Sequence, residues 1–91
     1  MPRDQVWYFY VVRCADASLY AGIALDPEER ARAPNAGRGA DYTARRRPVI
    51  LVYQEAHSTK SAARKREMQV KRWRAEKKER LVRGFPSTGS G

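Results

Sequence analysis

Cysteine and histidine are almost absent from this chain of 91 residues, which contains one of each, Cys14 and His57. A single cysteine excludes an internal disulfide and a cysteine-based zinc site, and a single histidine excludes a histidine-rich metal cluster. The chain also lacks any apolar run close to the ~20 residues that span a bilayer. Its first residues lack the long apolar segment and the small-residue cleavage site of a signal peptide. We therefore expect a cytoplasmic protein that does not insert into a membrane.

Acidic residues are also few compared with basic ones. Asp and Glu number 10 against 19 Lys and Arg, which gives a formal net charge of +9. A surface this basic favours a polyanionic partner, nucleic acid before an anionic membrane. With 42% hydrophobic residues the chain can form one small core, and its length leaves no room for a second. We expect one domain over residues 1–83 and a flexible tail over residues 84–91.

Apolar runs and turn signals predict three strands, at residues 6–13, 19–24 and 49–53. The first run is apolar on both faces, which is typical of a central strand. The turn-forming residues Asp16 and Ser18 are expected to join the first two strands into a hairpin. A long basic loop is expected at residues 35–48, with a helical turn near Tyr42.

Three helices are predicted, two of them by capping signals. Asp26 is the expected N-cap of the first helix, which begins at Pro27 and should stop before Pro34. The other two helices are expected at residues 60–73 and 75–82, the former capped by Ser58 or Thr59. The resulting order β-β-α-β-α-α predicts an α+β domain in which helices flank a small three-stranded sheet.

The longest of these helices places a carboxylate beside its apolar face. Ala63 and Val70 mark the inward stripe, and Glu67 lies four residues after the first and three before the second. One interpretation is a salt bridge from Glu67 to Lys71, one helical turn further on. The other is that Glu67 binds a hard metal ion, which prefers oxygen ligands on a rigid element. The helix alone leaves both open.

Two tyrosines and a glycine in the hairpin, and an arginine in the helix that follows, each allow two interpretations. Tyr10 and Tyr20 lie on adjacent strands, where they either pack or use their hydroxyls to orient or deprotonate a water molecule. Gly22 marks either close packing or a place where a phosphate backbone can approach. Arg30 is either a solvated residue or a fixed guanidinium beside a phosphate.

The basic loop is the expected nucleic-acid interface. Its arginines can contact phosphates and its tyrosine can stack on a base. The candidate contacts in and around it are Gly22, Asn35, Arg38, Tyr42, Arg45, Arg46, Arg47 and Lys71. His57 precedes the long helix and is expected at the surface or as a helix cap.

The stretch FYVVRCADASLYAGIALDPEER resembles the opening of the GIY-YIG nuclease domain, especially in its small stand-alone bacterial members. FYV (Phe9–Val11) stands where the family has GIY, and YAG (Tyr20–Gly22) stands where it has YIG. The spacing to Arg30 and the later Glu67 also match the family. The resemblance runs from about residue 8 to residue 82, nearly the whole chain.

The resemblance implies roles for four residues. Tyr10 and Tyr20 match the tyrosines that position and activate the attacking water, and Arg30 matches the arginine that stabilises charge on the phosphate. Glu67 matches the glutamate that holds a single divalent metal ion, normally Mg²⁺, with Mn²⁺ as a substitute. The implied function is a metal-dependent endonuclease that cuts DNA structure-selectively in repair or recombination.

One position departs from the family pattern. Relatives often carry a histidine four residues after the arginine, where this chain has Pro34, which cannot hold or relay a proton. A second hypothesis therefore stays open, a nucleic-acid-binding module that keeps the scaffold and has lost catalysis. A third is binding of the basic C-terminal helices to an anionic membrane, which Glu67, Glu76 and Glu79 argue against. The expected partners are DNA, with RNA as the alternative, and a protein that aids targeting; the chain is expected as a monomer or weak homodimer.

Overall fold

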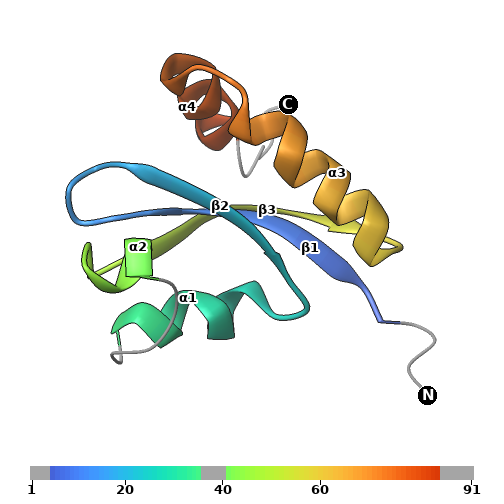
Figure 1. Cartoon of the computed structure of the whole chain (residues 1–91), viewed down its shortest axis with the longest axis horizontal. Helices are drawn as coiled ribbons and strands as arrows, with labels where there is room; N and C mark the ends of the chain where they lie inside the picture. Colours follow the sequence, from blue (N-terminus) through green and yellow to red (C-terminus); the bar gives the residue numbers. More distant parts are fainter. Residues whose placement is uncertain (1–4, 36–40, 85–91) are drawn as a thin grey trace.

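The computed structural model describes residues 5–35 and 41–84. Three strands and four helices follow one another along the chain (Figure 1). They are β1 (Trp7–Arg13), β2 (Leu19–Ala24), α1 (Pro27–Asn35), α2 (Asp41–Ala44), β3 (Ile50–His57), α3 (Lys60–Lys71) and α4 (Ala75–Arg83). The predicted α+β class and element order are confirmed, and the helical turn expected near Tyr42 is the short helix α2.

The sheet is antiparallel and has the strand order β2-β1-β3, so β1 is central, as its two apolar faces predicted. Helices α3 and α4 cover one face of the sheet, and α1 and α2 lie on the other (Figure 1). Because side chains alternate along a strand, β1 contributes to two cores. Phe9 and Val11 pack with Val70 of α3, while Tyr10 and Val12 pack with Ala31 of α1.

Side chains cap two helices as the sequence predicted. The Asp26 Oδ1 atom accepts the backbone N–H of Glu29 at 3.2 Å and so begins α1. The Thr59 Oγ1 atom accepts the backbone N–H of Ala62 at 3.0 Å, which makes Thr59 the cap of α3. Each cap satisfies an N–H group that has no partner within its helix.

The predicted stop of the first helix before Pro34 is wrong, because α1 continues to Asn35. The Asn35 side chain holds Val49 on both sides of its peptide unit. Its Oδ1 atom accepts the Val49 N–H at 2.8 Å, and its Nδ2 atom donates to the Val49 carbonyl at 3.1 Å. This long-range contact fixes the end of α1 beside β3, and tertiary contacts of this kind override local propensity.

The predicted end of the third strand at residue 53 is also wrong, since β3 continues to His57. Its polar second half pairs with β1, with Gln54 opposite Tyr10 and Glu55 opposite Phe9. His57 is therefore the last residue of a strand and not a helix cap, and its side chain is only 21% exposed. On the C-terminal side, α3 ends at Lys71, two residues earlier than expected.

The predicted tail falls almost entirely on residues 85–91, which lie outside the described part of the chain. Gly84, at the boundary, caps the C-terminal end of α4. Within the described ranges, no helix has the length and apolar character that crossing a bilayer requires.

Candidate active site

Tyr10 and Gly22 lie directly opposite each other on β1 and β2. A Cβ atom on Gly22 would stand 2.7 Å from the Tyr10 hydroxyl oxygen and 2.9 Å from its Cζ atom, closer than non-bonded atoms can approach. The missing side chain thus lets the Tyr10 ring lie across β2, the edge strand. This geometry matches the close-packing interpretation of Gly22, and contact between Gly22 and a phosphate stays a prediction.

Three of the other candidate residues, Arg30, Tyr20 and Glu67, affect the ionisation of the Tyr10 hydroxyl. Burial raises the pKa of Tyr10 above its usual value of 10.0, and a hydrogen bond with Arg30 and the charge of that guanidinium act in the opposite direction. Tyr20 and Glu67 add smaller effects that raise the pKa further. The Tyr10 hydroxyl therefore keeps its proton at neutral pH and can donate a hydrogen bond.

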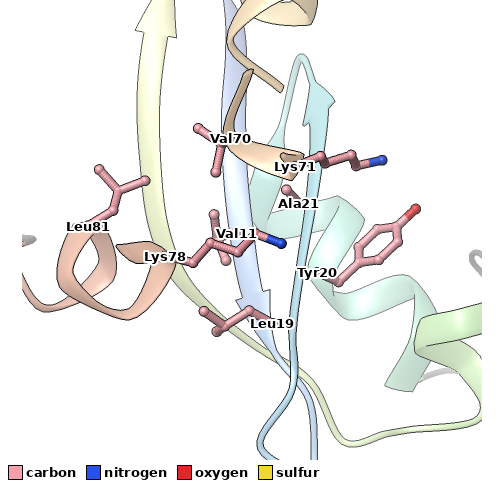
Figure 2. Close-up of a pocket in the computed structure, with 8 residues that line it drawn as sticks. All are labelled: Val11, Leu19, Tyr20, Ala21, Val70, Lys71, Lys78 and Leu81. Atoms are coloured by element: carbon pink, nitrogen blue, oxygen red, sulfur yellow. The ribbon is translucent and has the colours of Figure 1, made fainter. Parts of the chain in front are cut away.

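Glu67 reaches this edge of the sheet from α3. Its side chain is 19% exposed, and its carboxylate forms a salt bridge with Lys71, with 3.2 Å between Oε2 and Nζ. The Lys71 ammonium also lies 5.6 Å from the centre of the Tyr20 ring, within the range of a cation–π interaction. In Figure 2 the Tyr20 and Lys71 side chains extend to the same side of β2. The salt bridge predicted for Glu67 is present, and it stands beside a candidate catalytic tyrosine.

The donor set around Glu67 limits which metal ions fit. In residues 5–35 and 41–84, no three His, Cys, Asp or Glu side chains gather as a metal-binding group. A Zn²⁺ or Ca²⁺ site normally needs several protein ligands. Mg²⁺ instead keeps several waters and is often bound through one or two carboxylates and substrate phosphates. A lone half-buried carboxylate such as Glu67 therefore fits Mg²⁺ better than these other ions.

The basic loop meets the hairpin turn through Arg46. Its Nε atom lies 3.1 Å from the Asp16 carboxylate, and its backbone carbonyl accepts the N–H of Ala15 at 2.8 Å. Arg45 and Arg47 are exposed. The remaining loop candidates are Arg38 and the side chain of Tyr42, which lie outside the described part of the chain, and Asn35, whose amide is engaged by Val49.

A second polar cluster lies on the other edge strand and was not predicted. Tyr53, Glu55 and His57 share one face of β3 at a spacing of two residues, and Arg66 reaches them from α3. The Glu55 carboxylate accepts a hydrogen bond from Tyr53, lies 2.8 Å from the His57 Nε2 atom and 2.9 Å from the Arg66 Nε atom. The sequence signal for this cluster was the spacing of polar residues two positions apart, directly after the apolar part of a strand.

The pKa values of two groups in this β3 cluster, Glu55 and Tyr53, are shifted in opposite directions. Burial alone would raise the pKa of Glu55, but hydrogen bonds from Tyr53 and His57 and the charge of Arg66 outweigh burial and lower it. Burial and the Glu55 carboxylate raise the pKa of Tyr53 to about 12, against the effect of Arg66. The cluster therefore favours a charged Glu55 and a neutral Tyr53. The contact between the Glu55 carboxylate and Arg66 ties α3 to β3.

Comparison with known proteins identifies the class. The GIY-YIG catalytic domain matches residues 6–80, so the chain belongs to the GIY-YIG family of nucleases, as FYV and YAG implied. The chain is 50% identical over 76 residues to the UPF0213 protein of Staphylococcus aureus strain Mu3, an overlap that covers 84% of this chain and 93% of that protein.

Two solved structures resemble the chain over most of its length. The solution NMR structure of the UPF0213 protein from Bacillus halodurans shares 37% identity and a TM-score of 0.57, covering 90% of this chain and 89% of that one. A solution NMR structure of a protein from E. faecalis shares 38% identity and a TM-score of 0.62, covering 100% and 97%.

Proposed function

We propose that the protein is a divalent-metal-dependent endonuclease that hydrolyses phosphodiester bonds in DNA. The observation that supports this proposal is that Arg30, Tyr20 and Glu67, which come from three other elements, all influence the ionisation of the Tyr10 hydroxyl. A cluster of interacting titratable groups with one shifted pKa is typical of a functional site. Membership of a nuclease family gives the reaction class.

In the proposed mechanism each side chain has a separate task. The Arg30 guanidinium donates hydrogen bonds to the non-bridging oxygens of the phosphate and stabilises the charge that develops there. The Tyr20 hydroxyl orients the water that attacks phosphorus, and the P–O bond to the leaving sugar oxygen breaks. The proton of the water passes through solvent to that oxygen. Tyr10, protonated at neutral pH, donates a hydrogen bond from its hydroxyl. Glu67 would hold the Mg²⁺ or Mn²⁺ ion, which supplies additional positive charge for the phosphate.

The proposed substrate is DNA with a branched, nicked or damaged structure, as arises in repair and recombination. A domain of 91 residues offers room for an interface of single-module size, about 600–1,000 Å² of protein, which limits how long a base sequence it can read. Recognition of DNA shape through phosphate contacts needs less surface. A protein partner that targets the nuclease would add the rest.

The test is a cleavage assay on branched, flapped, single-stranded and duplex DNA, with Mg²⁺ or Mn²⁺. The variants are Glu67→Ala and, as a matched control, Glu76→Ala, which removes an exposed carboxylate from the first turn of α4. We expect metal-dependent cutting that Glu67→Ala abolishes and Glu76→Ala retains, with DNA binding intact in both. Equal cutting by Glu67→Ala and the unchanged protein would contradict the proposal.

The second candidate function is a nucleic-acid-binding module without catalysis. Pro34 within α1, in place of the usual histidine, favours it. This alternative predicts salt-sensitive DNA binding and no cutting by either the unchanged protein or Glu67→Ala. Cutting that appears only after Pro34→His would locate the loss at that position.

A further inference from the structure

A pocket of 160 Å³ adjoins the proposed site but belongs to none of the roles assigned above (Figure 2). It lies between the β2 side of the sheet and the helices α3 and α4. Its apolar lining comes from all four elements around it, with Val11 on β1, Leu19 on β2, Val70 on α3 and Leu81 on α4. The pocket is partly open to solvent, and Tyr20 and Lys71 are also among its lining residues.

The pocket also contains a cation, Lys78, that has no counter-ion in the described part of the chain. The side chain of Lys78 lines the pocket and extends from α4 toward β2 (Figure 2). Among the residues that the structure describes, none forms an ion pair with its ammonium, although the side chain is half-buried. A half-buried ammonium with open donor positions favours an occupant that carries hydrogen-bond acceptors.

We propose that this pocket binds the base of an unpaired pyrimidine nucleotide next to the phosphate that is cut. This proposal rests on the proposed function, because it places the phosphate of that nucleotide at Tyr20 and Lys71. The volume fits one six-membered ring, since an apolar cavity of about 150 Å³ binds benzene. The fused rings of a purine need more room. Lys78 donates to the exocyclic carbonyl oxygen that every pyrimidine base carries.

Charge argues for a nucleotide over an apolar side chain of a protein partner. The lining includes Lys78 and Lys71, the latter shared with the Glu67 carboxylate, in a chain with a net charge of +9. An occupant that combines a flat apolar ring with a phosphate matches both the apolar and the basic residues. A base inside a duplex is stacked and paired and cannot enter such a pocket. The nucleotide must therefore be single-stranded or extruded from the helix.

The test measures binding in the absence of divalent metal, so that cutting does not interfere. Fluorescence anisotropy compares oligothymidylate, oligodeoxyadenylate and an abasic strand of the same length and charge. We expect oligothymidylate to bind about tenfold more tightly than the abasic strand, the effect of one well-bound base. Equal affinities would show that only phosphates are bound, and tighter binding of oligodeoxyadenylate would overturn the single-ring assignment.

Two variants locate the effect in the pocket. Leu19→Trp fills the pocket without changing the charge, and should remove the preference for oligothymidylate while the abasic affinity stays constant. Lys78→Met removes the donor at similar length, and should lower the same preference severalfold. Its matched control is Lys77→Met, because Lys77 lies 4.3 Å from the centre of the Trp73 ring and does not line the pocket. An equal loss of preference in Lys77→Met would refute the assignment.

This experiment separates failure of the pocket from failure of the proposed nuclease. Metal-dependent cutting together with equal affinity for the thymidylate and abasic strands would overturn the pocket and leave the nuclease standing. A base-dependent affinity that Leu19→Trp abolishes, without any metal-dependent cutting, would support the pocket and overturn the nuclease. If Leu19→Trp fails to fold, the pair Lys78→Met and Lys77→Met decides the same question.

Discussion

The Tyr10 hydroxyl oxygen lies 2.7 Å from the place where a Cβ atom on Gly22 would stand. The two residues face each other across β1 and β2, so the smallest residue of an edge strand determines where a tyrosine of the central strand can reach. The position of the Tyr10 hydroxyl, which we propose to be catalytic, therefore depends on the absence of a Cβ atom at Gly22.

Gly22→Ala should displace the Tyr10 ring. We expect it to lower the free energy of unfolding by about 1–3 kcal/mol, as overpacking does, and to reduce cutting more than stability explains. Gly84→Ala is the matched control, because a Cβ atom there would lie 3.6 Å from its nearest neighbours, an ordinary contact. Urea denaturation and the cleavage assay measure both effects. Similar losses in the two variants would contradict this account.

Lys71→Met should strengthen metal binding while it weakens DNA binding. The Lys71 ammonium lies 3.2 Å from the Glu67 carboxylate. Its positive charge offsets the negative charge of Glu67 that a metal ion would need. Mn²⁺ titration followed by electron paramagnetic resonance measures metal affinity without requiring cutting. The slope of log DNA affinity against log salt should fall by about one unit, as expected for one lost phosphate contact. Lys65→Met, an exposed site on α3, is the control, and an equal rise in Mn²⁺ affinity there would exclude a local effect.

Arg45→Ala should weaken DNA binding to a similar extent whatever the sequence. Arg45 is exposed beside α2, and we expect the slope of log affinity against log salt to fall by about one unit. Arg46→Ala gives a less specific result, since it also removes the contact with Asp16 at 3.1 Å. Anisotropy at several salt concentrations measures the slope. An unchanged slope in Arg45→Ala would remove this residue from the interface.

The β3 cluster should make stability depend on pH at both extremes. The pKa of Glu55 is below its usual 4.5, so its contribution is present above that pH and is lost as pH falls through the folded-state value. The pKa of Tyr53 is raised from 10.0 to about 12, so its contribution is present below pH 10.0 and is lost as pH rises toward about 12.

Urea denaturation across pH, on the unchanged protein, Glu55→Gln and Tyr53→Phe, tests this dependence. Glu55→Gln should flatten the acid side of the profile, and Tyr53→Phe should flatten the alkaline side. Profiles that keep their full acid and alkaline slopes in these variants would show that other groups are responsible.

Glu79→Gln should loosen α4. The Glu79 carboxylate accepts two hydrogen bonds from the Arg13 guanidinium, at 2.7 and 2.9 Å, and so joins α4 to the end of β1. The pair is partly exposed, and we expect a loss of roughly 0.5–1 kcal/mol in the free energy of unfolding. Glu76→Gln, in the exposed first turn of the same helix, should cost less. An equal cost would indicate helix-dipole effects in place of the salt bridge.

Local signals predicted well where neighbouring residues decide the structure. The bounds of β2 and the cap at Asp26 follow from turn residues and capping chemistry a few positions apart. The ends of α1 and β3 were predicted too early, because the bond between Asn35 and Val49 and the pairing of residues 54–57 with β1 join distant parts of the chain.

The candidate site could be predicted from the sequence only in part. Spacing within one helix predicted the salt bridge from Glu67 to Lys71, but only the fold brings Lys71 over the Tyr20 ring. Helix periodicity likewise says nothing of the pocket under Lys78, because four elements form it. The identity of candidate residues is thus visible in a sequence, and their surroundings are not.

The central place of β1 has a consequence for how activity is lost. Tyr10 lies on the strand that pairs with both of its neighbours and contributes to the cores on both faces. Amides on such strands exchange with solvent only when a whole domain opens, whereas edges and termini open locally. Tyr10 should therefore keep its place until cooperative unfolding, whereas Tyr20, on the edge strand β2, should be displaced by local opening. Activity should then disappear at a lower denaturant concentration than the global structure.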